Sequence, residues 1–171
     1  MWQLRFSILV ARPRARGPPP PLGGTGVTTH PALGKSWPAV TYAAGREKIR
    51  EYARAVGETD ARYLDVEVAR AAGFADVVAP PMFVVVYAAA AIAPALFDPD
   101  VGIDFARMVH GGQEFTWERL VVAGDELTTA GSFAEYEEKN GMRFYTLATE
   151  TLDASGEPVV SGRWTNIVRG G

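Results

Sequence analysis

The stretch APPMFVVVYAAAAIAPALF, residues 79–97, contains no charged side chain, and it decides how the rest of the chain must be arranged. Pro80 and Pro81 predict the start of a helix, because proline fits the first helical turn, where its missing N–H is not needed. Nothing between Met82 and Ala93 disfavours a helix, and Pro94 limits how far it continues. A helix that is apolar on every side is buried on every side. We therefore expect a central helix that the remaining segments enclose.

Two other structures fit this apolar stretch less well. A membrane span needs about 20 apolar residues without internal prolines, whereas this stretch is shorter and holds Pro94. Val84–Val86 could form a short buried strand, but the run of alanines that follows favours a helix. The sequence therefore predicts a buried helix and no membrane partner.

The composition of the 171 residues fits one domain of ordinary size and excludes several kinds of site. The absence of cysteine excludes disulfides, cysteine nucleophiles and thiolate metal sites. Two histidines, His30 and His110, are too few for a multi-histidine metal site. Basic residues alternate with acidic ones along the domain, which is not typical of a nucleic-acid-binding protein. We expect no metal, no cofactor and no nucleic-acid partner.

Residues 1–30 differ from the rest of the chain. They contain several arginines, no acidic residue and the run GPPPPLGGTG. Such a proline- and glycine-rich run buries too little apolar surface to order itself, so we expect a disordered leader, with an organelle-targeting peptide as the alternative. The apolar piece at 6–11 is too short for a secretory signal. We therefore expect a cytoplasmic protein whose folded domain covers residues 31–171.

The first half of this domain is expected to contain one strand and two short helices before the central helix. Ser36–Tyr42 is predicted as a strand, and Pro38 places it at a sheet edge or a strand start. Apolar residues at positions i, i+3, i+4 and i+7 predict an amphipathic helix at Arg46–Val56. Asp65 is a suitable N-cap for a second helix at Val66–Ala72.

After Pro99 the apolar pattern becomes extended, and we expect four strands at residues 113–122, 126–137, 142–152 and 158–168. Asn140-Gly141 is a strong hairpin signal, because these two residues adopt the positive φ angles of a type I′ turn. The order of elements predicts an α+β domain in which one antiparallel five-stranded sheet curls around the central helix.

Five segments of this chain resemble the MaoC-like dehydratase family, whose hotdog fold wraps a sheet around one long helix. They are KIREYARAVGET, ARAAGF, APPMF, VHGGQEFTW and VAGDEL, in that order between residues 48 and 127. The resemblance is to the N-terminal, FAS-type dehydratase branch, which includes the non-catalytic subunit of (3R)-hydroxyacyl-ACP dehydratase. It implies reversible hydration of a trans-2-enoyl thioester of coenzyme A or acyl carrier protein. It also implies a homo- or heterodimer of two hotdogs.

The reaction needs a base for the proton beside the thioester carbonyl and a group that handles the β-hydroxyl or water. In catalytic members the family implies an Asp and a His in a motif G-D-x-N-P-x-H. The matching residues here are GETDARY, with Glu58 at the Asp position and Tyr63 at the His position. Imidazole titrates near neutrality and an ordinary tyrosine near pH 10. The obvious base is therefore missing.

Three hypotheses follow from this degenerate motif. In the first, the chain is the half of a heterodimeric hydratase that shapes the acyl channel, and its partner carries the Asp–His pair. In the second, the chain is self-sufficient, and Glu58, with Asp60 and Tyr63, performs the acid–base chemistry. In the third, it is an acyl-thioester binder or a thioesterase. These three residues could equally be a structural loop and a packing aromatic.

Residues at two places are candidates for binding the substrate. The backbone N–H groups of Met82, Phe83 and Val84 lie at the start of the central helix, where a carbonyl oxygen or anion is favoured. The side chains of Met82, Phe83 and Tyr87 could line an acyl channel or simply pack in the core. His110 and Gly111 lie in a family segment outside the catalytic motif. Gly111 could permit close approach of a ligand or form a bulge.

Overall fold

The computed structural model describes residues 29–170. The predicted leader therefore lies outside the described residues, except for Thr29 and His30. His30 belongs to the packed domain, because its ring lies 5.1 Å from the ring of Phe133 and 4.7 Å from that of Tyr136. His30, which the sequence analysis places at the end of the leader, therefore packs against side chains of the domain.

The described chain contains three α-helices and five strands, joined by short 3₁₀ turns. In chain order these are β1 (Ser36–Ala43), α1 (Arg46–Ala55), α2 (Val66–Ala71), α3 (Val84–Ile92), β2 (Met108–Trp117), β3 (Glu126–Lys139), β4 (Met142–Asp153) and β5 (Pro158–Arg169). Among residues 29–170, no helix has the length and apolarity that a membrane crossing requires.

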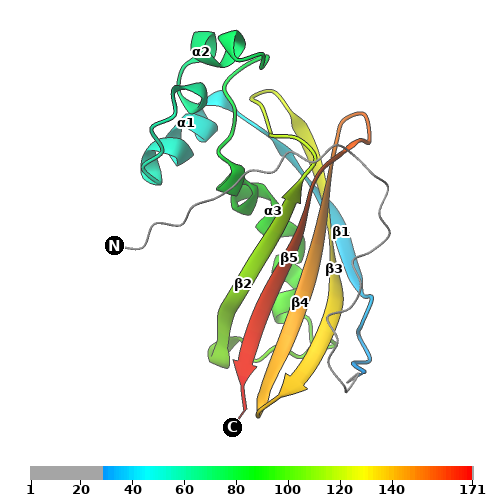
Figure 1. Ribbon diagram of the computed structural model, residues 1–171. Coiled ribbons are helices and arrows are strands. Elements are labelled where there is room, and N and C mark those ends of the chain that lie inside the picture. The colour runs from blue at the N-terminus through cyan, green and yellow to red at the C-terminus, as the bar shows by residue number, and fades with distance from the viewer. Residues whose placement is uncertain (1–28, 171) are drawn as a thin grey trace.

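The strands form one antiparallel sheet in the order β1-β3-β4-β5-β2. Figure 1 shows α3 lying against one face of this curled sheet, while α1 and α2 lie beyond one of its ends. The helix contacts β1, β3 and β4. The prediction of an α+β domain with a five-stranded antiparallel sheet and a central helix is confirmed.

Two local signals in the sequence correspond to local features of the sheet. Asn140 and Gly141 have φ angles of 54° and 71° and join β3 to β4, as expected of a type I′ hairpin. Pro38 lies on the edge strand β1, at a shift in register between Trp37 and Val40. A bulge on an edge strand tolerates proline because no ladder N–H is needed there.

The central helical segment differs from the prediction in two ways. Only Val84–Ile92 is α-helical, with 3₁₀ turns at Pro81–Phe83 and Ala93–Phe97, because the prolines disrupt regular hydrogen bonding at both ends. The helix is also not buried on every side. Val85, Val86 and Ala89 are half-buried and Ala90 is exposed, since the sheet of a single chain covers only one side of the helix.

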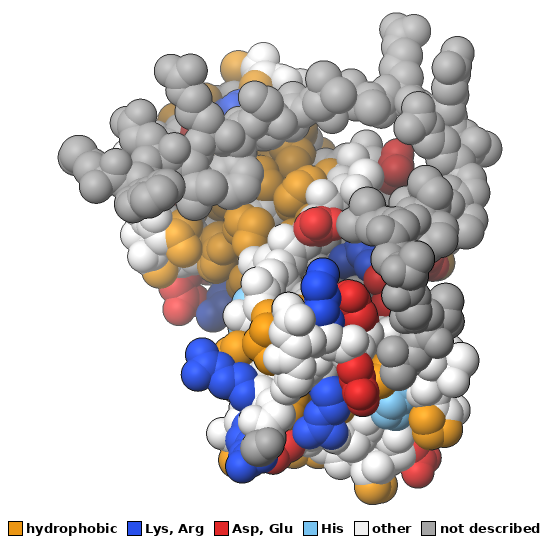
Figure 2. All heavy atoms as spheres, turned by 60° about the horizontal axis from the view of Figure 1, so that its bottom comes forward, with side chains coloured by type: hydrophobic (Ala, Val, Ile, Leu, Met, Phe, Trp, Pro, Cys, Tyr) orange, Lys and Arg blue, Asp and Glu red, His pale blue; other side chains and the backbone are white. Residues whose placement is uncertain are grey.

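The strand expected at residues 113–122 instead covers Met108–Trp117. The strand starts earlier than expected because it continues through a register shift between His110 and Gly112, so the bulge that the sequence allows at Gly111 is present. After Trp117 the chain leaves the sheet, and residues 121–123 pair with residues 77–79. Figure 2 shows one face of the molecule, on which hydrophobic side chains gather in one region beside scattered charged ones.

Gly131 on β3 fixes how closely α3 approaches the sheet. A Cβ atom at this position would lie 2.2 Å from the carbonyl oxygen of Ala91 and 3.2 Å from Cγ2 of Ile92. The first of these contacts is with helix backbone, which cannot rotate away as a side chain can. The helix is therefore seated directly on the backbone of β3.

We predict that Gly131→Ala lowers the free energy of unfolding by about 1–3 kcal/mol or more, because the added methyl group forces α3 away from the sheet. Urea titration followed by circular dichroism measures this change. Gly112→Ala is the matched control, since this glycine also lies in a strand and an added Cβ would meet no atom within 4 Å. Equal stability of the two variants would contradict the close seating of the helix.

Asp98 ties the end of the central segment to β1. Its carboxylate accepts hydrogen bonds from the Lys35 ammonium at 2.8 Å and from Trp37 Nε1 at 3.0 Å. The bond from Lys35, together with that from Trp37, lowers the pKa of Asp98 to about 2. The ionised form is thus favoured in the folded protein.

We predict that Asp98→Asn destabilises the protein at neutral pH and that the difference disappears in acid. The folded pKa of about 2 lies below the ordinary value, so the stabilisation is present above about pH 4 and is lost as the pH falls towards 2. Urea unfolding of both proteins at several pH values measures it. A difference that stays constant down to the folded pKa would show that the carboxylate charge is not responsible.

Candidate functional site

The loop that carries the degenerate motif follows α1 and is built by local hydrogen bonds. Gly57 has a φ of 76° and ends the helix. Asp60 caps the next turn by accepting the backbone N–H of Arg62 at 2.9 Å, and its carboxylate also pairs with the Arg62 guanidinium. That guanidinium holds the pKa of Asp60 below its usual range. Asp60 is thus ionised, and its carboxylate already bonds to the backbone N–H and the guanidinium of Arg62.

The other two residues of the predicted acid–base site lie in different surroundings. Glu58 is exposed. Tyr63 is buried beside Ala53 and Val78, and this burial, with a smaller effect of Glu58, raises the pKa of its hydroxyl. The three residues are neighbours in the loop but have different surroundings. The pKa of Asp60 is lowered and that of Tyr63 is raised, so both are shifted away from neutrality.

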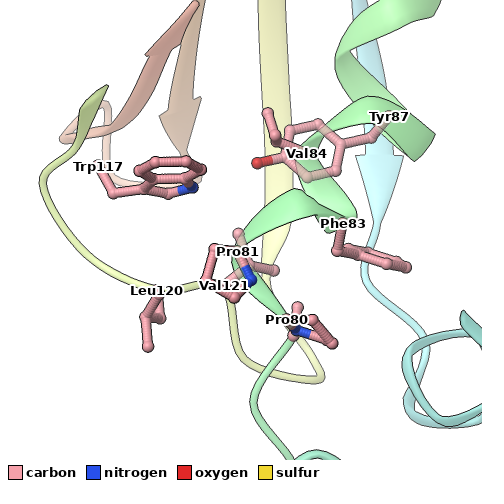
Figure 3. A pocket seen from close by; sticks show the side chains of 9 residues that line it. Pro80, Pro81, Phe83, Val84, Tyr87, Trp117, Leu120 and Val121 are labelled. Carbon is pink, nitrogen blue, oxygen red and sulfur yellow. The ribbon is translucent and has the colours of Figure 1, made fainter. Parts of the chain in front are cut away.

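A small cavity lies between the start of α3 and the segment that follows β2 (Figure 3). Its volume is about 10 Å³, which is room for about one water molecule. The residues that line it are Ala79, Pro80, Pro81, Phe83, Val84, Tyr87, Trp117, Leu120 and Val121. All of them are apolar or aromatic, and Tyr87 and Trp117 are the two whose side chains carry a polar group.

The structure brings together three of the predicted substrate-binding residues, of which Val84 was expected to contribute only its backbone N–H. Phe83, Val84 and Tyr87 line the cavity, whereas Met82 is half-buried and does not. His110 and Gly111 lie on β2 and do not line the cavity either. A Cβ atom at Gly111 would lie 2.6 Å from Cδ1 of Ile167, so a larger residue here would displace this side chain of β5. Packing between the strands thus accounts for the glycine without a ligand.

The helix start offers fewer backbone donors than expected. The N–H of Phe83 donates to the carbonyl of Pro80 at 2.8 Å, and the N–H of Val84 donates to the carbonyl of Pro81. Both bonds form because the first turn is 3₁₀ and not α-helical. Within the described part of the chain, only Met82 of the three predicted donors has an N–H without an acceptor.

Tyr87 carries the one buried side-chain polar atom among the described residues that has no hydrogen-bond partner, its hydroxyl oxygen. The residue is 2% exposed. Burial raises the pKa of Tyr87, and the nearby charge of Asp125 raises it further. The hydroxyl is therefore protonated at neutral pH and available as a hydrogen-bond donor.

Trp117 faces Tyr87 across the cavity. Figure 3 shows its indole nitrogen and the Tyr87 hydroxyl pointing toward one another. The hydrogen bonds of residues 29–170 include no acceptor for this indole N–H, although Trp37 and Trp164 both have one. The sequence analysis placed Trp117 in a strand only. Trp117 lies inside the strand expected at residues 113–122, whereas the observed strand β2 ends at this residue. The family segment VHGGQEFTW that contains it was the available signal.

Arg119 holds the segment that closes the cavity. Its guanidinium donates to the Leu120 carbonyl at 3.2 Å, to Asp125 at 2.6 Å and to Asp153 at 3.1 Å. Asp125 also accepts the N–H of Val122 at 2.9 Å. These bonds fix Leu120 and Val121 in place beside the helix start. No cluster of three side chains able to hold a metal occurs in the described chain.

Comparison with known proteins places this geometry among dehydratases. A family model described as FAS1-like, dehydratase domain region, matches residues 32–161. A UPF0336 protein of Clavibacter michiganensis is 49% identical over 132 residues, which cover 77% of this chain and 89% of that protein. A UPF0336 protein of Leifsonia xyli is 45% identical over 146 residues, covering 84% of this chain and 98% of that protein.

Solved structures of the same fold include two dehydratases. A MaoC-like dehydratase matches with a TM-score of 0.75 and 28% identity over 82% of this chain, which corresponds to 43% of that larger chain. The C-terminally truncated HadBC (3R)-hydroxyacyl-ACP dehydratase complex of Mycobacterium tuberculosis matches with a TM-score of 0.71 and 27% identity, covering 80% of this chain and 96% of that chain.

We predict that Tyr87→Phe leaves the protein at least as stable as the wild type, with a gain of up to about 1 kcal/mol in the free energy of unfolding. The substitution keeps the ring and removes a buried hydroxyl that lacks a partner. Thermal and urea unfolding measure the effect. A clear loss of stability would show that the hydroxyl bonds to a group of the protein itself.

Proposed function

The chain belongs to the family of FAS1-like dehydratase domain regions, and from this premise we propose that it is one subunit of an R-specific enoyl-thioester hydratase or (3R)-hydroxyacyl-thioester dehydratase. In this proposal the subunit shapes the acyl channel, and a second hotdog subunit supplies the Asp–His pair. The substrate is carried on coenzyme A or acyl carrier protein, no further cofactor takes part, and the complex acts in the cytoplasm.

The state of the motif loop is the observation that carries this proposal. Asp60 is occupied by a cap and by Arg62, and Tyr63 is packed in an apolar cluster. A general base for this reaction needs a pKa near the working pH and access to the substrate. The loop meets neither need through these two residues, so the acid–base pair is best supplied by another chain.

The surface of the domain is compatible with a second hotdog. β2 is an edge strand whose outer side pairs with no strand among the described residues, and exposed strand edges are usually paired or covered. The half-buried face of α3 at Val85, Val86 and Ala89 would be covered at the same time. The 27% identical HadBC structure is itself described as a complex, which supports a partner that differs from this chain.

We predict that the purified chain hydrates crotonyl-CoA poorly and that co-expression with a hotdog protein carrying the intact G-D-x-N-P-x-H motif restores hydration by at least about 100-fold. General acid–base catalysis contributes about this much or more. Absorbance of the enoyl thioester measures the rate. Replacing the motif histidine of the added protein should abolish the gain.

Glu58→Gln is the variant that separates this proposal from a self-sufficient enzyme. We expect it to leave the activity of the complex within about twofold, because the exposed Glu58 side chain takes no part in the proton transfer. Full activity of the isolated chain that disappears in Glu58→Gln would overturn the division of labour. Release of free thiol from an acyl-CoA would instead identify a thioesterase.

A further inference from the structure

We propose that the Tyr87 hydroxyl and the Trp117 indole N–H form a two-donor site that binds one oxygen atom of the acyl thioester. This inference rests on the proposed function and goes beyond it. It assigns to this chain two side chains that hydrogen-bond an oxygen atom of the substrate, in addition to the apolar walls of the acyl channel. From the sequence alone, Tyr87 is expected either to line an acyl channel or to pack in the core.

The two donors converge from different parts of the fold. Tyr87 lies on α3, one turn after Phe83, and Trp117 is the last residue of β2. Figure 3 shows their polar atoms facing one another across the cavity. The Tyr87 oxygen is fully enclosed and has no partner among residues 29–170. A buried donor without an acceptor is costly, so its retention points to a ligand that supplies one.

The size and lining of the cavity define the ligand group. A volume of about 10 Å³ admits one oxygen-sized atom. The remaining walls are apolar side chains, including Pro80, Pro81 and Leu120. An indole N–H is only a donor, and the raised pKa of Tyr87 keeps its hydroxyl able to donate. Because the other walls are apolar, they favour a neutral acceptor over a charged one. A thioester carbonyl and a β-hydroxyl oxygen are the two acceptors that the proposed substrate offers.

The position of the site allows an acyl thioester to reach it. The cavity adjoins the first turn of α3, where Met82 is the predicted donor whose N–H remains available. Trp117 and Leu120 are only half-buried, so the outer wall is accessible on that side. Arg119 anchors this wall through Asp125 and Asp153, which fixes the segment that follows Trp117.

The test compares three ligands of the full-length chain by isothermal titration calorimetry. (R)-3-hydroxybutyryl-CoA carries both oxygens, butyryl-CoA carries only the carbonyl, and the S-butyl-CoA thioether carries neither. Tyr87→Phe and Trp117→Phe each remove one donor and keep an aromatic ring. Tyr136→Phe is the matched control, because the Tyr136 hydroxyl donates to Glu138 and lies outside the cavity lining.

We expect the wild type to bind at least one oxygen-bearing ligand about tenfold more tightly than its oxygen-free counterpart, which is the effect of one buried hydrogen bond. Tyr87→Phe and Trp117→Phe should reduce that ratio towards one, and Tyr136→Phe should leave it unchanged. Loss of the butyryl to thioether ratio assigns the carbonyl. Loss of the hydroxybutyryl to butyryl ratio assigns the β-oxygen.

Three other outcomes are decisive in different ways. Ratios that both variants leave unchanged would show that the cavity holds a bound water only, which overturns the two-donor site while the proposed function stands. A wild-type chain that binds none of the three ligands, alone or with the motif-bearing partner, would overturn both proposals. A fall in affinity for all three ligands alike would indicate a packing role and also overturn the inference.

Discussion

The fold depends on the contact between the backbones of α3 and β3 at Gly131. With no Cβ in the way, the carbonyl of Ala91 approaches the strand more closely than any other residue would allow. The alanines of the helix also allow this close approach, since Ala88 and Ala91 are small and are buried with almost no exposed surface. Small residues on both sides let a helix and a sheet pack backbone to backbone. This contact places α3 over β1, β3 and β4, while β2 lies at the other edge of the sheet and pairs only with β5 among the described residues.

The same seating creates the cavity. Residues 77–79 pair with residues 121–123, so the start of the helix is tied to the segment that leaves β2. Arg119 braces that segment from the other side, through two carboxylates in different turns. The helix start can therefore neither close onto Trp117 nor move away from it. A gap the size of one atom persists, and Tyr87, whose hydroxyl oxygen is enclosed and has no partner among the described residues, is one of the residues that line it.

Local chemistry made most of the fold predictable from the sequence. Pro80 and Pro81, the alanine run, Asp65 and Asn140-Gly141 each act through the backbone of neighbouring residues, and each predicted element exists. The misses have long-range causes. Gly111 continues a strand because Ile167 of β5 fills the space above it, and Trp117 meets Tyr87 only after the sheet has curled. The site was predictable in part, since Phe83, Val84 and Tyr87 follow the prolines, but an unpartnered hydroxyl depends on contacts that no spacing reveals.

The motif loop of this chain differs from the motif G-D-x-N-P-x-H in the surroundings of its residues as well as in their identity. An imidazole placed at Tyr63 would enter a cluster with Ala53 and Val78, where burial disfavours its charged form and lowers its pKa. The neighbouring Asp60 could not orient it, because that carboxylate already serves the cap and Arg62. The backbone of the loop also supports the segment just before the helix, since the Arg62 carbonyl accepts the N–H of Val78. In this chain Asp60 and Arg62 therefore support the loop and the segment before the helix start, which agrees with the proposal that a second subunit supplies the acid–base pair.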